Sequence, residues 1–419
     1  MTTERALPVT AEQPATGRRR AAWLLLLGPG LMVMLADTDA GSVVTAAQSG
    51  ASWGYRLVLP QLILIPILYV VQEITVRLGV VTGQGHGALI RQHYGRGWAY
   101  LSGGTLFVAC VGALVTEFAG VAGVGQLAGV PPWLSITVVA VALSVLCLTG
   151  GYRRVEIVGI TLGALELLFI PAAFLAHPDA HALVSGLGHP LVLRTDFLQL
   201  LAANVGAVIM PWMVFYQQGA VLDKGLRPQD LRTGRLDTLL GSVLTQMIMV
   251  AIVVATAATL GRSSPGGSLD TIGEIAQALV PFLGHRAATV LFGAGMFGAA
   301  TVAALVVAVA ASRGLGEVLG WRTTLNDRPG RARAFYGVCT AALVGSGVAV
   351  ILAPSLVQLS VDVQVMNALL LPIVLGFLLL LERSALPPED RMRGVHKYVT
   401  WTLTGVVILF GLYTITTVV

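Results

Sequence analysis

The sequence is poor in charged residues. Only 11% of its 419 residues are Asp, Glu, Lys or Arg, whereas an ordinary soluble domain carries about 25%. Hydrophobic residues make up 55% of the chain, and long apolar runs recur from Ala22 to Val419. So few charges cannot cover a water-soluble surface, which nearly excludes a soluble enzyme of this length. We expect an all-α polytopic membrane protein, with its apolar helices in the lipid bilayer of the cell (inner or plasma) membrane.

Cysteine is scarce as well, and Cys110, Cys147 and Cys339 all fall inside apolar runs. An odd number of cysteines in such runs argues against a disulfide framework or a metal cluster. The apolar segments also lack enzyme motifs such as H-E-x-x-H, G-x-S-x-G and the P-loop, so we expect no enzymatic activity. The net charge of +5 does not indicate nucleic-acid binding, and the sequence suggests no obligatory protein partner.

Eleven apolar segments are long enough to cross a membrane. A polar N-terminal tail, residues 1–20, precedes them, and residues 21–419 are expected to form a single transmembrane domain. A shorter amphipathic piece from Ser268 to Leu283 is expected to lie at the membrane surface. The predicted spans are residues 22–50, 55–78, 98–125, 133–149, 155–176, 197–220, 238–260, 285–311, 334–353, 355–381 and 398–418.

The basic residues support this count. With the N-terminus in the cytoplasm, the cytoplasmic segments hold all but four of the 26 Lys and Arg residues, as the positive-inside rule requires. The exceptions are Arg56, Arg194, Arg262 and Arg286. An extra or missing span early in the chain would destroy this bias, so we predict a cytoplasmic N-terminus and an extracytoplasmic C-terminus.

Eleven spans divide into five plus five plus one. An odd number of helices per repeat forces the two repeats into opposite orientations, which is the arrangement of inverted-repeat transporters. The first repeat would cover about residues 22–176, the second about 197–381, and 398–418 would be an extra helix. This leucine-transporter-like fold places its site where the first helix of each repeat is broken, so spans one and six should both be broken.

Span one carries two acids, Asp37 and Asp39, inside an apolar run. On a regular helix, positions i and i+2 point about 200° apart, whereas in an unwound stretch they lie on one side. Gly41 and Ser42 favour unwinding. The pair therefore indicates either a cation site at a local break or a buried carboxylate paired with Arg or Lys, and the neighbouring spans contain almost no basic residue.

Span six carries Pro211, which cannot donate a hydrogen bond and frees a carbonyl upstream, near Ala207. Free carbonyls at the end of a helix attract cations. Met210 precedes this proline. A methionine in a membrane helix is usually a packing residue, but beside a break that faces a carboxylate it is a candidate thioether ligand.

These features occur in a specific order. Gly28-Pro29 opens span one, Asp39-Ala40-Gly41-Ser42 follows, and span six reads Ala207-Val208-Ile209-Met210-Pro211-Trp212. The order resembles the Nramp family of divalent-metal transporters over nearly the whole chain, since that family carries Asp-Pro-Gly-Asn in its first helix and Ala-x-x-Met-Pro-His in its sixth. Further matches are Gln48 with Gly54-Tyr55, the stretch from Leu78 to Gly83, the stretch from Tyr152 to Glu156, and Gln364 eight residues before Pro372.

The resemblance implies a metal site in which the metal is the transported substrate, so no cofactor is implied. The implied ligands are the carboxylate of Asp39, the backbone carbonyls of Ala36 and Ala207, the sulfur of Met210, the hydroxyl of Ser42 and the amide of Gln364, which would close the shell, with Asp37 as an added acid beside the site. The residues expected to line the pathway or to gate it are Glu117, Trp212, Gln217, Asp362 and Asn367.

Several positions depart from the family pattern. The family's histidines in the sixth helix are replaced by Trp212 and Gln217, and of two acids that serve its proton route in the third helix, Glu117 is present but the second position is Gly120. Trp and Gly cannot relay protons, and Gln does not titrate near neutral pH. The resemblance is therefore to the divergent, magnesium-transporting branch, with weak or no proton coupling.

Three functions remain open. The first is import of Mg²⁺ and/or Mn²⁺ by alternating access, since Mg²⁺ is a hard ion that keeps several waters and needs oxygen ligands. The second is proton-coupled transport of Mn²⁺ or Fe²⁺, which the soft sulfur of Met210 suits better. A remote third is an amino-acid carrier of the same fold, although two acids in the break would repel a substrate carboxylate.

Other polar residues in or between the spans allow less specific interpretations. Glu73 and Glu166 either line a pathway or pair with a neighbouring polar or basic group. Polar residues around Gln364 indicate a cavity wall. His86 and His93, in the connection between spans two and three, are expected to be solvated.

Overall fold

The computed structural model describes residues 28–188, 192, 194–263, 275–276, 284–352 and 357–418. All regular structure in these residues is helical, which confirms the all-α class. The predicted tail, residues 1–20, lies outside the described residues, and so does the amphipathic piece from Ser268 to Leu283 apart from residues 275 and 276.

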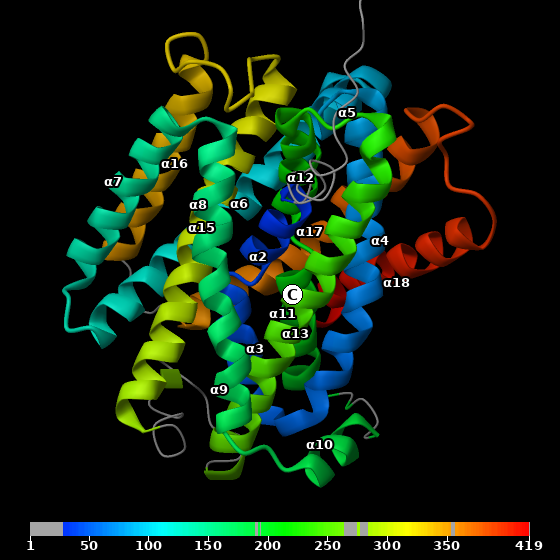
Figure 1. Ribbon diagram of the computed structural model, residues 1–419. Coiled ribbons are helices and arrows are strands. Elements are labelled where there is room, and N and C mark those ends of the chain that lie inside the picture. The colour runs from blue at the N-terminus through cyan, green and yellow to red at the C-terminus, as the bar shows by residue number, and fades with distance from the viewer. Residues whose placement is uncertain are drawn as a thin grey trace, which may run out of the picture.

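The first span is broken, as predicted. It consists of α2 (Pro29–Asp37) and α3 (Ala40–Trp53), and residues 38 and 39 between them are not helical. The sixth span is broken in the same way, into α11 (Thr195–Val208) and α12 (Pro211–Lys224). Figure 1 shows α2 and α3 in blue inside the bundle, beside α11 and α12 in green.

The remaining spans lie around these four half-helices and agree with the predicted segments to within about four residues, with two exceptions. The seventh span begins seven residues earlier than predicted, and the eighth ends eight residues later. The fifth span also departs from a regular helix, because a 3-10 turn, η2 (Ala164–Leu168), separates its two α-helical parts. The helices are α4 (Val58–Thr82), α6 (Arg96–Leu127), α7 (Pro132–Gly150), α8 (Tyr152–Gly163), α9 (Phe169–Leu175), α13 (Leu231–Ser263), α15 (His285–Leu319), α16 (Arg333–Ile351), α17 (Val357–Ser384) and α18 (Gly394–Val418).

Ten helical runs in the described residues are long and apolar enough to cross a membrane. One of them, Ala40–Thr82, has 43 residues. A straight helix of this length would measure about 65 Å, roughly twice the hydrocarbon thickness of a bilayer. The run instead turns through the 3-10 segment η1 (Gly54–Leu57), where Gly54 has a φ of 59°. The count of eleven membrane crossings stays a prediction.

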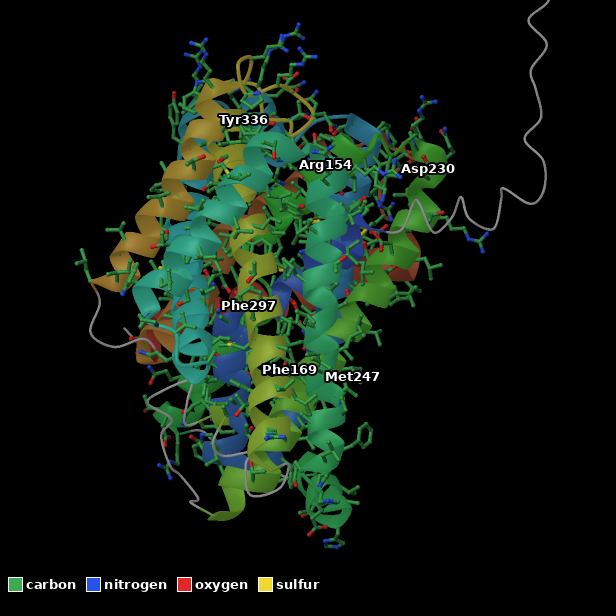
Figure 2. All side chains as sticks on the ribbon, turned by 60° about the vertical axis from the view of Figure 1, so that its left-hand side comes forward. Arg154, Phe169, Asp230, Met247, Phe297 and Tyr336 are labelled. Atoms are coloured by element: carbon green, nitrogen blue, oxygen red, sulfur yellow. The ribbon has the colours of Figure 1, made fainter. Side chains whose placement is uncertain are left out.

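Two short helices that the sequence pattern did not indicate connect the spans. They are α5 (His86–Tyr94) and α10 (Ala180–Leu187), and they lie at opposite ends of the bundle (Figure 1). Figure 2 places Arg154, Asp230 and Tyr336 at one end of the bundle. Arg154 and the neighbours of Asp230 belong to the segments predicted to be cytoplasmic, but the orientation in the membrane stays a prediction.

The start of α2 is fixed to α13 by one carboxylate. Asp237 accepts hydrogen bonds from three backbone amides at this helix N-terminus, Gly28 N at 3.1 Å, Gly30 N at 2.7 Å and Leu31 N at 3.1 Å. The first amides of a helix have no partner within the helix, so this single side chain satisfies most of them. The half-helix that precedes the first break is thereby tied to the seventh span.

The expectation that His86 is solvated is wrong. His86 begins α5 and is fully buried, with its ring 4.8 Å from that of Phe215 and its Nδ1 3.3 Å from Gln218 Oε1. Burial lowers the pKa of His86 to about 4, although the contact with Gln218 opposes the shift. The reason for the error is tertiary packing, because α12 covers the start of α5. His93, about two turns further along α5, is exposed as expected.

We predict that this buried imidazole makes the fold sensitive to acid. Because His86 binds a proton more weakly in the folded state than in the unfolded state, stability is lost as the pH falls below about 6.5. Between pH 7.5 and 5 the wild-type protein should lose about 2 kcal/mol more than a His86→Gln variant. Thermal unfolding in detergent at both pH values measures the difference, with His93→Gln as the control. Equal losses in wild type and His86→Gln would contradict it.

Candidate metal site

The break in the first span leaves one backbone carbonyl without its helical partner. In an unbroken helix, Ala36 O would accept a hydrogen bond from Ala40 N. Ala40 N donates instead to Glu117 Oε2, at 3.0 Å. Glu117 comes from α6 and is fully buried, so it supports the start of α3 from a neighbouring span.

The break in the sixth span has the same spacing and a different cause. The partner of Ala207 O would be the nitrogen of residue 211, which is a proline and has no hydrogen to donate. The hydroxyl of Ser42 donates to Ala207 O instead, at 3.0 Å. A side chain from the first break thus satisfies a carbonyl of the second, and the two broken helices meet at this contact.

Asp39 stands at the centre of this meeting point. It is the N-cap of α3, and its Oδ1 accepts hydrogen bonds from Ser42 N at 2.6 Å and from Gln364 Nε2 at 3.4 Å. Its Oδ2 has no hydrogen-bond partner among the described residues, although the side chain is fully buried. A buried carboxylate oxygen without a donor is suited to a cation.

Met210 is the last residue of the second break and directly precedes α12. It is fully buried and forms the N-cap of α12, followed by Pro211 at the first helical position. Its Sδ is 3.2 Å from Trp212 Nε1, which donates a hydrogen bond to the sulfur. Trp212, at the position of the family's histidine, therefore holds the sulfur of the candidate ligand Met210 in a hydrogen bond.

The amides of α17 divide into two groups. Gln364 and Asn367 are buried and bonded to each other, with Asn367 Nδ2 2.9 Å from Gln364 Oε1. They extend the polar cluster around Asp39. Asp362 is exposed, so the structure places it outside this cluster. The difference follows from helical geometry, because positions 362 and 364 point in nearly opposite directions on a continuous helix.

Two further predicted residues, Asp37 and Gln217, lie in α2 and α12, which pack against each other. Asp37 ends α2, is 2% exposed, and its Oδ1 has no hydrogen-bond partner in the described part of the chain. Gln217 is buried in α12 and donates to Thr238 Oγ1 at 3.0 Å. Thr38, between the two acids, contacts Thr245 of α13 through their hydroxyl groups.

Gly120 packs where the family has its second acid of the third helix. A Cβ built on Gly120 would lie 2.6 Å from the Cβ of Ala40 and 3.1 Å from that of Ala300. A side chain of any size would separate α6 from α3 and α15. The absence of an acid at position 120 is thus matched by the close packing of its neighbours.

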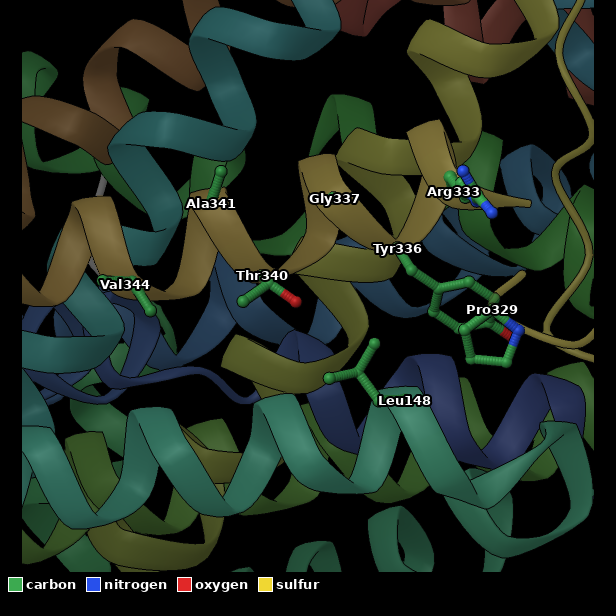
Figure 3. Close-up of a pocket in the computed structure, with 8 residues that line it drawn as sticks. All are labelled: Leu148, Pro329, Arg333, Tyr336, Gly337, Thr340, Ala341 and Val344. Carbon is green, nitrogen blue, oxygen red and sulfur yellow. The ribbon is translucent and has the colours of Figure 1, made fainter. Parts of the chain in front are cut away.

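The site does not rest on a cluster of side chains of the usual metal-binding types. Within the described ranges, no group of three or more His, Cys, Asp or Glu residues is arranged to hold a metal ion. A hollow of about 600 Å³ lies elsewhere, between Leu148 of α7 and α16 residues including Arg333 and Val344 (Figure 3). No carboxylate lines it, which makes it unsuitable for a divalent cation.

An all-helical membrane protein whose first and sixth spans are both broken, with the two breaks in contact, is a transporter with the leucine-transporter-like inverted repeat. The sequence pattern of the Nramp family, described as natural resistance-associated macrophage protein-like, matches residues 30–417. The chain belongs to the Nramp family. Its relatives are transporters and not enzymes, and no cofactor is indicated because the metal ion is their substrate.

Relatives named as divalent metal cation transporters agree with this assignment. The chain is 28% identical over 306 residues to the divalent metal cation transporter MntH of Burkholderia ambifaria, covering 69% of this chain and 68% of the relative. It is 29% identical over 283 residues to MntH of Aeromonas hydrophila, covering 64% and 68%.

Solved structures share the fold. The manganese transporter of Eremococcus coleocola superposes with a TM-score of 0.80 at 19% identity, over 97% of this chain and 89% of that one. MhsT in complex with L-phenylalanine superposes with a TM-score of 0.61 at 14% identity, over 93% and 98%. The fold is therefore shared with a manganese transporter and with a protein that binds L-phenylalanine.

The contact between α11 and α17 provides a test of the site's framework. A Cβ at Gly206 would overlap the backbone oxygen of Gln364 and lie 2.7 Å from Ala368 N. We predict that Gly206→Ala costs about 1–3 kcal/mol of stability through overpacking and weakens metal binding by displacing Gln364. Gly104→Ala is the control, because no atom lies within 4 Å of a Cβ there. Thermal unfolding and metal titration of both variants measure the effect, and an unchanged Gly206→Ala protein would contradict it.

Proposed function

We propose that this chain imports a divalent metal cation, Mg²⁺ and/or Mn²⁺, across the cell membrane by alternating access. The N-terminus would be cytoplasmic and the C-terminus extracytoplasmic. The observation that carries the proposal is the contact between the two breaks, where Ser42 Oγ meets Ala207 O beside the unpartnered Asp39 Oδ2. The names of the MntH relatives and of the manganese transporter support a divalent metal as the cargo.

The proposed inner ligands are oxygen atoms from both broken helices. Asp39 supplies the charge, Ala36 and Ala207 supply carbonyls, and the hydroxyl of Ser42 and the amide of Gln364 supply neutral oxygens. These groups need small rotations to turn toward an ion, because Ser42 and Gln364 now bond to protein atoms. Oxygen ligands with room for water suit Mg²⁺, and they accept Mn²⁺ as well.

The contact of Met210 supports a hard cation. A thioether selects softer metals when its sulfur is free. Here the indole of Trp212 donates to that sulfur, so an ion would have to displace the hydrogen bond before Met210 could bind. Mg²⁺, which has little affinity for sulfur, has no need of this ligand. Transport of Mn²⁺ or Fe²⁺ in which Met210 acts as a ligand is the alternative.

We also propose that metal transport is not coupled to protons. Gly120 is packed against Ala40, Trp212 is bonded to Met210, and Gln217 is bonded to Thr238. Gly120 has no side chain to carry a proton, and neither Trp212 nor Gln217 titrates near neutral pH. A proton route through these positions, as implied for the family, would therefore be interrupted.

The first test removes the central charge. Asp39→Ala should abolish uptake of Mg²⁺ and Mn²⁺ into proteoliposomes, because no other inner ligand carries a charge. The exposed Asp196, whose partner is Arg194 at the surface, provides the control variant Asp196→Ala, which should transport normally. Thermal unfolding checks that Asp39→Ala is folded. Wild-type uptake by this variant would refute the site.

The second test follows protons. A pH dye inside proteoliposomes should report no acidification while Mg²⁺ or Mn²⁺ enters, since the uncoupled carrier moves no proton with the metal. Competition between the two metals in the same vesicles shows which one is preferred. A lumenal acidification that requires metal entry and disappears in Asp39→Ala would instead support the proton-coupled alternative.

A further inference from the structure

Glu166 is a buried carboxylate that the proposed inner ligand set does not use. It lies in η2, the 3-10 turn that interrupts the fifth span, and it is fully buried. Neither of its carboxylate oxygens has a hydrogen-bond partner among the described residues. A short 3-10 stretch inside a helix often marks a functional position, and an uncompensated buried carboxylate is strongly unfavourable in a membrane protein.

The packing of α8 on α2 brings Glu166 to the first break. A Cβ on Gly163 would lie 2.7 Å from the Cβ of Leu35. Three residues after Gly163 comes Glu166, and three residues after Leu35 comes Thr38. The Thr38 side chain lies near the Glu166 carboxylate without the geometry of a full hydrogen bond, and Asp37 and Asp39 are close enough to interact with its charge. The carboxylate therefore faces the segment in which the first span is unwound.

The acids at this break have no basic partner in the described structure. The ion pairs among the described residues involve other carboxylates. Glu73 of α4, for example, pairs with Arg77 and Arg235 at 2.6 Å each. Asp37 and Glu166 both retain buried oxygen atoms without partners. Together with the free oxygen of Asp39, they place three acidic side chains around one polypeptide break, where a cation or its bound waters could occupy the unpartnered oxygens.

We propose that Glu166, together with Asp37, accepts hydrogen bonds from the waters of a hydrated Mg²⁺ ion bound to Asp39, and so determines specificity for Mg²⁺. This inference rests on the proposed function. Mg²⁺ gives up its waters reluctantly and usually keeps several of them in a protein site. Carboxylates that bind these waters contribute to affinity without touching the metal. Mn²⁺ exchanges its waters more readily and depends less on them.

Uptake kinetics of the full-length protein in proteoliposomes test the proposal. Glu166→Gln keeps the size of the side chain and removes its charge, and Glu166→Asp keeps the charge on a shorter chain. The exposed Glu389 provides the control variant Glu389→Gln. We expect Glu166→Gln to raise the KM for Mg²⁺ about tenfold or more while the KM for Mn²⁺ changes less than about threefold. Glu166→Asp should restore part of the preference, and Glu389→Gln should behave as wild type.

A purely structural role of Glu166 predicts a different result. It would lower uptake of both metals equally, so an unchanged ratio of the two KM values in Glu166→Gln overturns the inference. If Glu166→Gln does not fold, Glu166→Asp decides, and an unchanged ratio in that variant overturns the inference as well. Failure of the proposed function is distinguishable, because wild-type protein would then take up neither Mg²⁺ nor Mn²⁺. Uptake of Mn²⁺ without Mg²⁺ would overturn the inference and leave the proposed function standing.

Discussion

A helix that breaks inside a membrane exposes backbone groups that lipid cannot satisfy, and this chain breaks two of them. The amide released by the first break is bound by Glu117, and the carbonyl released by the second is bound by Ser42. The second of these bonds joins the two breaks directly. The position of every other group in the candidate site depends on this exchange of helical hydrogen bonds for contacts between spans.

The same exchange explains why a cation could be bound with so few charged ligands. Backbone carbonyls at an interrupted helix carry partial negative charge and point out of the helix end. One carboxylate, Asp39, is then sufficient as a directly bound charge, and the amide of Gln364 and the hydroxyl of Ser42 complete the set of oxygens. On the other side of the first break, Asp237 ties the start of α2 to α13 through three amides. Any movement of α2 in the proposed transport cycle has to release or carry these bonds.

Much of the fold could be predicted from the sequence because membrane helices obey simple rules. Long apolar runs gave the spans, and a polar or proline residue inside such a run, as at Asp39 and Pro211, gave the two breaks that the structure contains. The resemblance to the Nramp family implied Gln364 and Asp39 as ligands of one ion, and in the structure Gln364 Nε2 lies 3.4 Å from Asp39 Oδ1. The ligand roles themselves remain proposals.

The rest depends on contacts between distant segments, which no local pattern encodes. The burial of His86 results from its cover by α12, and the exposure of Asp362 results from the rotation of α17 about its own axis. The bond from Trp212 to Met210 needs the extended backbone at the second break. Glu166 could be recognised from sequence as an acid in an apolar span, but its lack of a partner is visible only once α8 is packed against α2.

The most direct test of a cation held between the two broken helices is anomalous diffraction from crystals soaked in Mn²⁺. The account predicts a single strong peak in contact with Asp39, bounded by the carbonyls of Ala36 and Ala207, and its loss in Asp39→Ala crystals. A peak bound elsewhere in the transmembrane bundle, or one that persists without the Asp39 carboxylate, would contradict it.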